Sequence, residues 1–128
     1  PASASLSSAI QYTGVAANDQ TGWSVSVVQD ADGDGFADIL IGAYANASAA
    51  SFAGSTHLVL GSAAPASGGL SSAIQFIGEN ADDYSGIAVS GSGDMNADGF
   101  ADLLIGAYGH DDSGYSDGAA YLVLGSGL

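Results

Sequence analysis

The sequence is an internal duplication. Residues 6–11, Leu-Ser-Ser-Ala-Ile-Gln, recur as residues 70–75, and this offset of 64 residues holds without a gap to the C-terminus. About half of the aligned positions are identical. Each copy of such a repeat is one structural unit, whose apolar face needs neighbouring units to bury it. The chain therefore divides into two units, residues 1–64 and 65–128, joined by the small, Pro- and Gly-containing segment 63–69.

Each unit is predicted to contain four short strands. Residues 23–28 alternate between apolar and polar side chains, and Ile39-Leu40-Ile41 is continuous and mostly β-branched, as in a strand buried on both faces. Clusters of Gly, Asn, Asp and Ser separate the strands, and no window has the apolar stripe of a long helix. The four expected strands of the first unit cover residues 9–13, 23–28, 39–41 and 55–60. We therefore predict an all-β fold, in which each unit is a four-stranded propeller blade rather than part of a sandwich.

The composition excludes several classes of protein. The chain has no lysine, arginine or cysteine, and its fourteen acidic residues give a formal charge of −14. A chain without cations cannot neutralise phosphates, so we expect no nucleic-acid partner. Anionic membrane surfaces repel such a chain, and no apolar run is long enough for membrane insertion. Without cysteine there is no disulfide framework and no thiolate chemistry.

Half of the acidic residues lie in two nine-residue loops, 30–38 and 94–102. Oxygen-bearing side chains stand at positions 1, 3, 5 and 9 of each loop, and a glycine at position 6 permits a sharp turn. The backbone carbonyl at position 7 can point into the same space. Hard oxygen donors at this spacing suit Ca²⁺, whereas Mg²⁺ prefers a stricter octahedron. The predicted ligands are Asp30, Asp32, Asp34, Phe36 (carbonyl) and Asp38, and Asp94, Asn96, Asp98, Phe100 (carbonyl) and Asp102.

Three other interpretations of these loops are less consistent with the sequence. An acidic turn that merely caps a hairpin does not explain why the spacing occurs twice, and its carboxylates would repel one another without a counter-ion. An EF-hand needs flanking helices and a Glu at position 12, where this chain has Ile41 and Ile105. A glycine- and aspartate-rich β-roll repeats about every nine residues, not every 64.

The order of elements resembles the FG-GAP repeat of integrin α-subunit propellers and their bacterial relatives. A glycine-led strand precedes each Asp-rich loop, and the segments 38–44 and 102–108 end in Ile-Gly-Ala-Tyr. The resemblance covers residues 6–64 and 70–128. The Phe-Gly element of the family is replaced by Gly22-Trp23 and by Gly86-Ile87. The resemblance implies a β-propeller with calcium in its loops, held by the ten residues named above.

Other polar and aromatic residues are assigned structural roles. His57 and His110 are expected in a strand or loop rather than as metal ligands, and Asp19 and Asp83 as acceptors of turn hydrogen bonds. Asp111 and Asp112 fit a solvated loop better than a second ion site, and Trp23 fits a core better than a sugar-stacking platform. No serine has a recognisable partner base, so we do not expect an enzyme.

Two blades cannot close a propeller, so we expect assembly with further copies. Residues 73–77 are predicted to complete the blade begun by residues 23–60. The strand at 9–13 would then complete the last blade of another copy. Head-to-tail contacts of this kind close into rings. A homotrimer with six blades is favoured, and a homotetramer with eight is the other closed form.

The expected function is that of a calcium-binding propeller module with a structural or adhesion-like role. One Ca²⁺ per repeat gives two per chain, and secretion or display at the cell surface is expected. The alternative is a lectin-like module that binds carbohydrate, because a fungal lectin family has an integrin-like propeller. The ligand would accordingly be a protein or a glycan.

Overall fold

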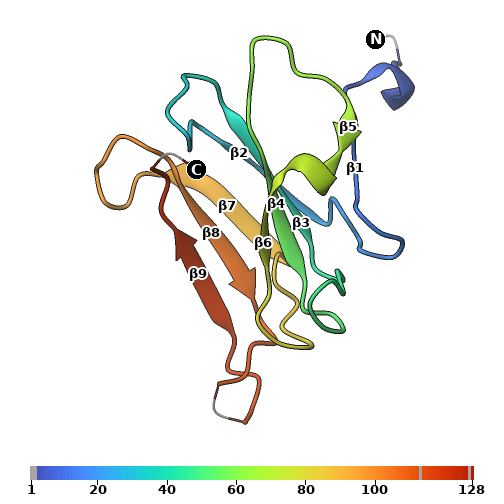
Figure 1. Ribbon diagram of the computed structural model, residues 1–128, viewed down its shortest axis with the longest axis vertical. Helices are drawn as coiled ribbons and strands as arrows, with labels where there is room; N and C mark the ends of the chain where they lie inside the picture. The colour runs from blue at the N-terminus through green and yellow to red at the C-terminus, as the bar shows by residue number, and fades with distance from the viewer. Residues whose placement is uncertain (1–2, 113, 127) are drawn as a thin grey trace.

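The computed structural model describes residues 3–112, 114–126 and 128 (Figure 1). Nearly all regular structure in it is β-strand, and the only helices among these residues are two single 3₁₀ turns, η1 (Leu6–Ser8) and η2 (Leu70–Ser72). The strands are β1 (Tyr12–Thr13), β2 (Ser24–Val28), β3 (Asp38–Ala43), β4 (Ser55–Val59), β5 (Gly68–Gly69), β6 (Ile74–Ile77), β7 (Ala88–Gly93), β8 (Asp102–Ala107) and β9 (Ala119–Val123). The all-β prediction is confirmed.

Seven of the strands form one curled sheet in the order β6-β4-β3-β2-β7-β8-β9. Neighbouring strands are antiparallel except at the centre, where β2 and β7 run parallel and meet through a single bridge between Val28 and Gly91. The sheet therefore consists of two antiparallel groups, and we call β2-β3-β4-β6 the first blade and β7-β8-β9 the second.

The first blade takes its outer strand from the second repeat. β6 pairs antiparallel with β4 over four residue pairs, from Ser55–Ile77 to Leu58–Ile74. The predicted role of residues 73–77 in completing this blade is therefore confirmed. The chain crosses from one repeat to the other in mid-blade, which ties the two units together through backbone hydrogen bonds as well as side-chain packing.

The second blade has only three strands among the described residues. β9 pairs with β8 on one side, and no described strand pairs with its other side. The N-terminal strand is shorter than predicted: only Tyr12 and Thr13 of residues 9–13 form β1, and Ala9 is the C-cap of the 3₁₀ turn η1. β1 pairs with Gly68 and Gly69 of β5 in the linker and belongs to neither blade (Figure 1).

The hydrophobic core lies between the two blades. Leu40 and Leu58 of the first blade pack with Leu103 of the second, and all three are fully buried. Successive side chains of a strand point to opposite faces, so each blade contributes one face to this core. The described residues contain no helix that is long and apolar enough to cross a membrane.

Candidate functional site

The two Asp-rich loops lie at the same end of the blades. Residues 30–38 join β2 to the start of β3, and residues 94–102 join β7 to the start of β8. The glycine at position 6 has a left-handed backbone in both loops, with φ of 91° at Gly35 and 94° at Gly99. This conformation favours glycine, because it places a Cβ too close to the backbone in other residues. The sharp turn predicted from these glycines is confirmed.

The aspartate at position 9 closes each loop. Asp38 is fully buried and accepts hydrogen bonds from the N–H of Ala31 and of Gly61, each at 2.8 Å. Asp102, at the equivalent position, accepts from the N–H of Met95 and of Gly125. Each carboxylate therefore holds the start of its loop against the end of the blade's third strand. Charge-assisted bonds of this kind are among the stronger hydrogen bonds in proteins.

The carboxylate at position 1 lies inside the turn of the loop. Asp30 accepts hydrogen bonds from the N–H of Gly33, Asp34 and Gly35, at 2.6, 3.1 and 2.9 Å. In the second loop, Asp94 accepts the equivalent bonds from residues 98 and 99. The loops thus fold around their first carboxylate, and the position is set by local backbone geometry rather than by contacts elsewhere.

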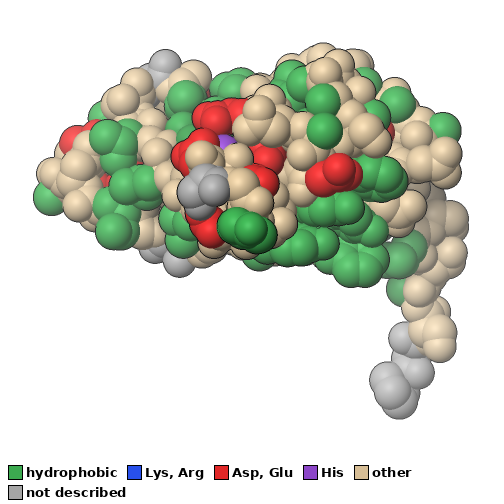
Figure 2. All heavy atoms as spheres, turned by 90° about the horizontal axis from the view of Figure 1, so that it is seen from below, with side chains coloured by type: hydrophobic (Ala, Val, Ile, Leu, Met, Phe, Trp, Pro, Cys, Tyr) green, Lys and Arg blue, Asp and Glu red, His purple; other side chains and the backbone are tan. Residues whose placement is uncertain are grey.

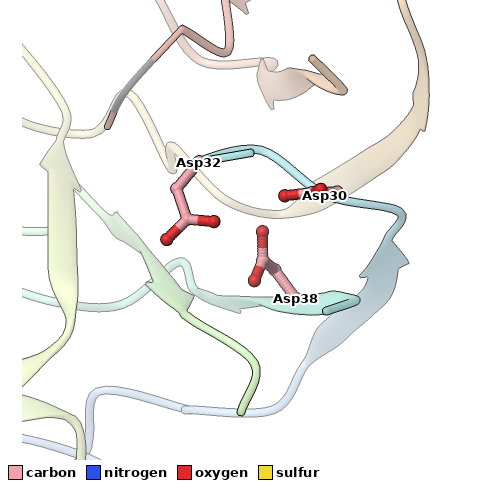
Figure 3. A group of neighbouring side chains, drawn as sticks. All are labelled: Asp30, Asp32 and Asp38. Atoms are coloured by element: carbon pink, nitrogen blue, oxygen red, sulfur yellow. The ribbon is translucent and has the colours of Figure 1, made fainter. Parts of the chain in front are cut away.

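Three carboxylates of the first loop converge. One oxygen from each of Asp30, Asp32 and Asp38 lies within 4.8 Å of the others, and the side chains point toward a common space (Figure 3). Asp34 is not part of this group, and its Oδ1 accepts a hydrogen bond from the N–H of Phe36 at 2.8 Å. The structure therefore brings three of the four predicted carboxylates together in this loop.

The second loop is arranged differently around its asparagine. The Nδ2 of Asn96 donates to Oδ2 of Asp98 at 2.9 Å, so the amide and the carboxylate satisfy one another. No three acidic or histidine side chains among the described residues of this loop converge as they do in the first. The coordination roles of Asp94, Asn96, Asp98 and Asp102, and of the Phe36 and Phe100 carbonyls, stay predictions.

The electrostatics of the first loop follow from its composition. Burial raises the pKa of Asp32 above its usual value, and the negative charges of Asp34, Asp38 and Asp30 raise it further, while a hydrogen bond from the Asp34 N–H works against both. With no Lys or Arg in the chain, no side chain of this protein supplies a permanent positive charge. The loop is therefore suited to a cation from solution.

The opposite end of the blades has a row of aromatic rings. Trp23 contacts Tyr44 edge-on with ring centroids 5.0 Å apart, and Tyr44 neighbours Tyr84 at 6.2 Å. Tyr84 in turn stacks on Tyr108 at 5.1 Å and lies 5.7 Å from Phe52. Trp23 is 61% exposed, so the expectation that it is a core residue is wrong. Its alternation with Val25 and Val27 places all three on an uncovered surface of the first blade.

A histidine links two loops at this same end. When the molecule is viewed from this end of the blades, acidic side chains gather around a histidine (Figure 2). The Nδ1 of His110 lies 3.3 Å from Oδ2 of the buried Asp83 and 3.2 Å from the hydroxyl of Tyr121, and its Nε2 lies 3.4 Å from Asp112. The hydrogen bond with Asp83 raises the pKa of His110 above its usual value, and Asp112 adds to this against the opposing effect of burial.

The first repeat has the equivalent link, with an amide in place of the imidazole. Asn46 Nδ2 donates to Oδ2 of the buried Asp19 at 2.8 Å. Asp19 also accepts from the N–H of Ala16, as Asp83 does from that of Asn80, which confirms the predicted turn hydrogen bonds of both aspartates. The longer-range link was not predicted from the sequence, although His110 and Asn46 occupy equivalent positions in the two repeats.

His57 lies inside the first blade, in strand β4, as predicted for a structural residue. It is fully buried, and its Nε2 is 3.2 Å from the hydroxyl of Ser55. Burial lowers the pKa of His57, and the charge of Asp19 opposes this. A side chain enclosed in this way has no access to a ligand from solution, so its role is in packing.

Comparison with known proteins identifies the repeat. No curated protein matches the sequence significantly. The family model described as the FG-GAP repeat matches the chain twice, over residues 21–59 and 85–123. Both matches include an inner strand, the Asp-rich loop and the two strands that follow it. Together they cover more than half of the sequence, and the chain therefore belongs to the FG-GAP repeat family.

Proposed function

We propose that this protein is a calcium-binding β-propeller module, secreted or displayed at the cell surface, with a structural or adhesion-like role. FG-GAP repeats form β-propeller modules, are typical of extracellular proteins and are typically non-enzymatic. The observation that carries the proposal is the convergence of Asp30, Asp32 and Asp38 in a chain without a single Lys or Arg.

Calcium fits the donor set of both loops. Carboxylate, amide and backbone carbonyl oxygens are its usual ligands, and thiolates that would favour softer metals are missing from the sequence. The ion would be held by the ten residues predicted above, one ion per repeat and two per chain. Its chemistry here is electrostatic: a divalent cation neutralises the clustered carboxylates and so fixes the loop between two strands.

The exposed faces of the blades support assembly with a second copy. Ala31 is fully buried where the first blade meets the second, whereas its repeat equivalent, Met95, is 70% exposed. On the face of the first blade that is turned away from the second, Val25 is 65% exposed, whereas its repeat equivalent, Val89, packs against the core. The Val25 face of one copy is therefore the repeat equivalent of the face that already covers Ala31 within the chain. Such a head-to-tail contact uses two different surfaces and closes into a ring.

The free edge of β9 supports the same assembly. The first blade is completed by β6, and the second lacks the equivalent strand among the described residues. An unpaired strand edge is a template for another strand. The N-terminal segment of a second copy has the matching sequence, because residues 9–13 align with residues 73–77. Three copies would make six blades, which we favour, and four would make eight.

Mass in solution and calcium content, measured on one sample of the 128-residue chain, test this function. We expect two Ca²⁺ per chain by elemental analysis and the mass of a trimer by light scattering, both lost after chelation. A chain that retains no calcium after dialysis against millimolar calcium, and shows no heat of binding, contradicts the metal proposal. A folded monomer at micromolar concentration contradicts the assembly proposal.

The row of exposed aromatic rings favours carbohydrate binding as the second candidate function. Trp23 and Tyr108 are 61% and 60% exposed, and exposed flat aromatic faces can stack on a sugar ring. A glycan array with Trp23→Ala as the control separates this function from the first. Signals that the variant loses support a lectin-like module, and an array without signals rejects it.

A further inference from the structure

The two Asp-rich loops touch each other across the boundary between the blades. The N–H of Ala101 in the second loop donates to the backbone oxygen of Asp30 in the first, at 2.9 Å. The ring of Phe100 lies over Gly33 so closely that a Cβ added there would come within 2.4 Å of ring atom Cε1. The second loop therefore rests on the first through one hydrogen bond and one tightly seated ring.

These contacts involve residues that would hold the two calcium ions, one in each loop. Asp30 contributes a carboxylate to the converging group and, through its backbone oxygen, anchors the second loop. Phe100 is itself a predicted ligand through its carbonyl, and its ring contacts the first loop. A shift of Asp30 on metal binding would therefore act directly on the segment that carries Phe100, and a shift of Phe100 would act on the first loop.

We propose that the two loops bind calcium cooperatively, with the Phe100 ring on Gly33 as the coupling contact. The inference rests on the proposed calcium function. A filled loop has its backbone fixed, so that the facing loop loses less freedom when it takes up its own ion. Such coupling is reciprocal: each ion increases the affinity for the other by the same factor.

The same contact cannot form in the same way between copies. The repeat equivalents of Phe100 and Gly33 are Phe36 and Ala97. Phe36 is 43% exposed, and Ala97 has a left-handed backbone, with φ of 58°, and carries the Cβ that Gly33 lacks. If Phe36 of another copy approached the second loop as Phe100 approaches the first, its ring would meet this Cβ. The coupling therefore belongs to the pair of loops within one chain, and Phe36 provides a matched control.

Calcium titration by calorimetry of variants with one functional loop measures the coupling. Asp34→Ala leaves only the second loop, and Asp98→Ala leaves only the first. We expect the overall two-ion association constant of the unaltered protein to exceed the product of the two single-loop constants by roughly fivefold or more. A ratio of one, with both loops still filling, overturns the coupling while leaving the proposed function intact. If the unaltered protein binds no calcium, the proposed function fails instead.

The ring contact is tested by Phe100→Ala, which keeps the backbone carbonyl. In this background the ratio should fall to one, whereas Phe36→Ala should leave it unchanged. A ratio that stays at its original value in Phe100→Ala, or that Phe36→Ala also abolishes, overturns the assignment to Phe100. Because the single-loop variants retain both rings, cooperativity itself remains measurable even if Phe100→Ala does not fold.

Discussion

Leu40 and Leu104 occupy the same position in the two repeats, yet Leu40 is fully buried and Leu104 is 47% exposed. Leu40 lies on the face of β3 that meets the second blade, and Leu104 lies on the equivalent face of β8. The difference arises from what covers each face, because the local sequences Ile-Leu-Ile-Gly-Ala and Leu-Leu-Ile-Gly-Ala are nearly identical.

This relationship leads to a first prediction, on Leu104→Ala. If a second copy covers the face, truncation should destabilise the assembled protein by about 2 to 5 kcal/mol, as for a buried leucine. Denaturant unfolding at micromolar concentration measures the change, and light scattering reports loss of the oligomer. A change within about 0.5 kcal/mol, as is usual for surface positions, would show that this face is exposed to solvent in solution.

The second prediction concerns removal of calcium. Binding to the folded state stabilises it by about 2.7 kcal/mol when free ligand is at a hundred times the dissociation constant. EDTA should therefore lower the melting temperature measured by calorimetry or circular dichroism. The first loop should lose its structure first, because it has four carboxylates where the second has three and Asn96. An unchanged melting curve after thorough chelation would contradict a stabilising metal.

The third prediction assigns the ions to individual loops. Asp34→Ala and Asp98→Ala should each reduce the calcium content from two ions per chain to one, measured by mass spectrometry under native conditions. Asp34 is the more demanding test, since its carboxylate lies outside the converging group of the first loop. Two ions retained by both variants would show that position 5 is not a ligand.

The fourth prediction concerns the N-terminal segment. Deletion of residues 1–14 removes η1 and β1 but leaves both Asp-rich loops and every strand of the curled sheet. Within one chain this segment is attached through the short β1–β5 pairing and a hydrogen bond from the Gln11 N–H to the Ser67 hydroxyl. The truncated chain should lose its discrete oligomer and aggregate or unfold. A well-defined trimer or tetramer would exclude strand exchange as the source of assembly.

The fifth prediction is a pH dependence caused by His110. Its pKa is raised in the folded protein, so protonation stabilises the fold; this stabilisation is complete below the unfolded pKa of about 6.5 and is lost as the pH rises through the folded value. His110→Asn preserves a donor to Asp83, as Asn46 is to Asp19, and removes only the charge. The unaltered protein should therefore melt above the variant in mild acid, with the difference fading as the pH rises.

The other histidine, His57, does not affect this comparison. Its pKa is lowered by burial, so its contribution has the opposite sign: stability decreases as the pH is lowered below about 6.5, because the unfolded chain takes up the proton more readily. Both proteins contain His57, and its effect cancels in their difference. A difference between the melting temperatures that does not change with pH would rule out a charged link at His110.

The sequence predicts the features that depend on local chemistry. The strands, the left-handed glycines Gly35 and Gly99 and the turn-bonding aspartates follow from residue types and their spacing, and the duplication makes each of them visible twice. The completion of the first blade by residues 73–77 also follows, because the order of strands in a blade leaves one position for them.

Features that depend on distant contacts could not be predicted in this way. Trp23 precedes an alternating strand, and this pattern would suit a core residue. Its exposure, however, depends on whether another blade covers this face of the first blade. The seating of Phe100 on Gly33 joins loops from different blades, and no local pattern signals it. The difference between the two Asp-rich loops, in contrast, is local: Asn96 stands where the first loop has Asp32, and its amide donates to Asp98.

The single bridge between Val28 and Gly91 has a mechanical consequence. Antiparallel pairing makes each blade stiff, but among the described residues only this bridge and the isolated bridge between Gly54 and Ser85 join β-structure across the blade boundary. The angle between the blades therefore depends mainly on the volume of the side chains packed between them. Enlarging or trimming Leu103 should rotate one blade against the other before it breaks either, so that the curvature of the sheet can be tuned by substitution at a single buried position.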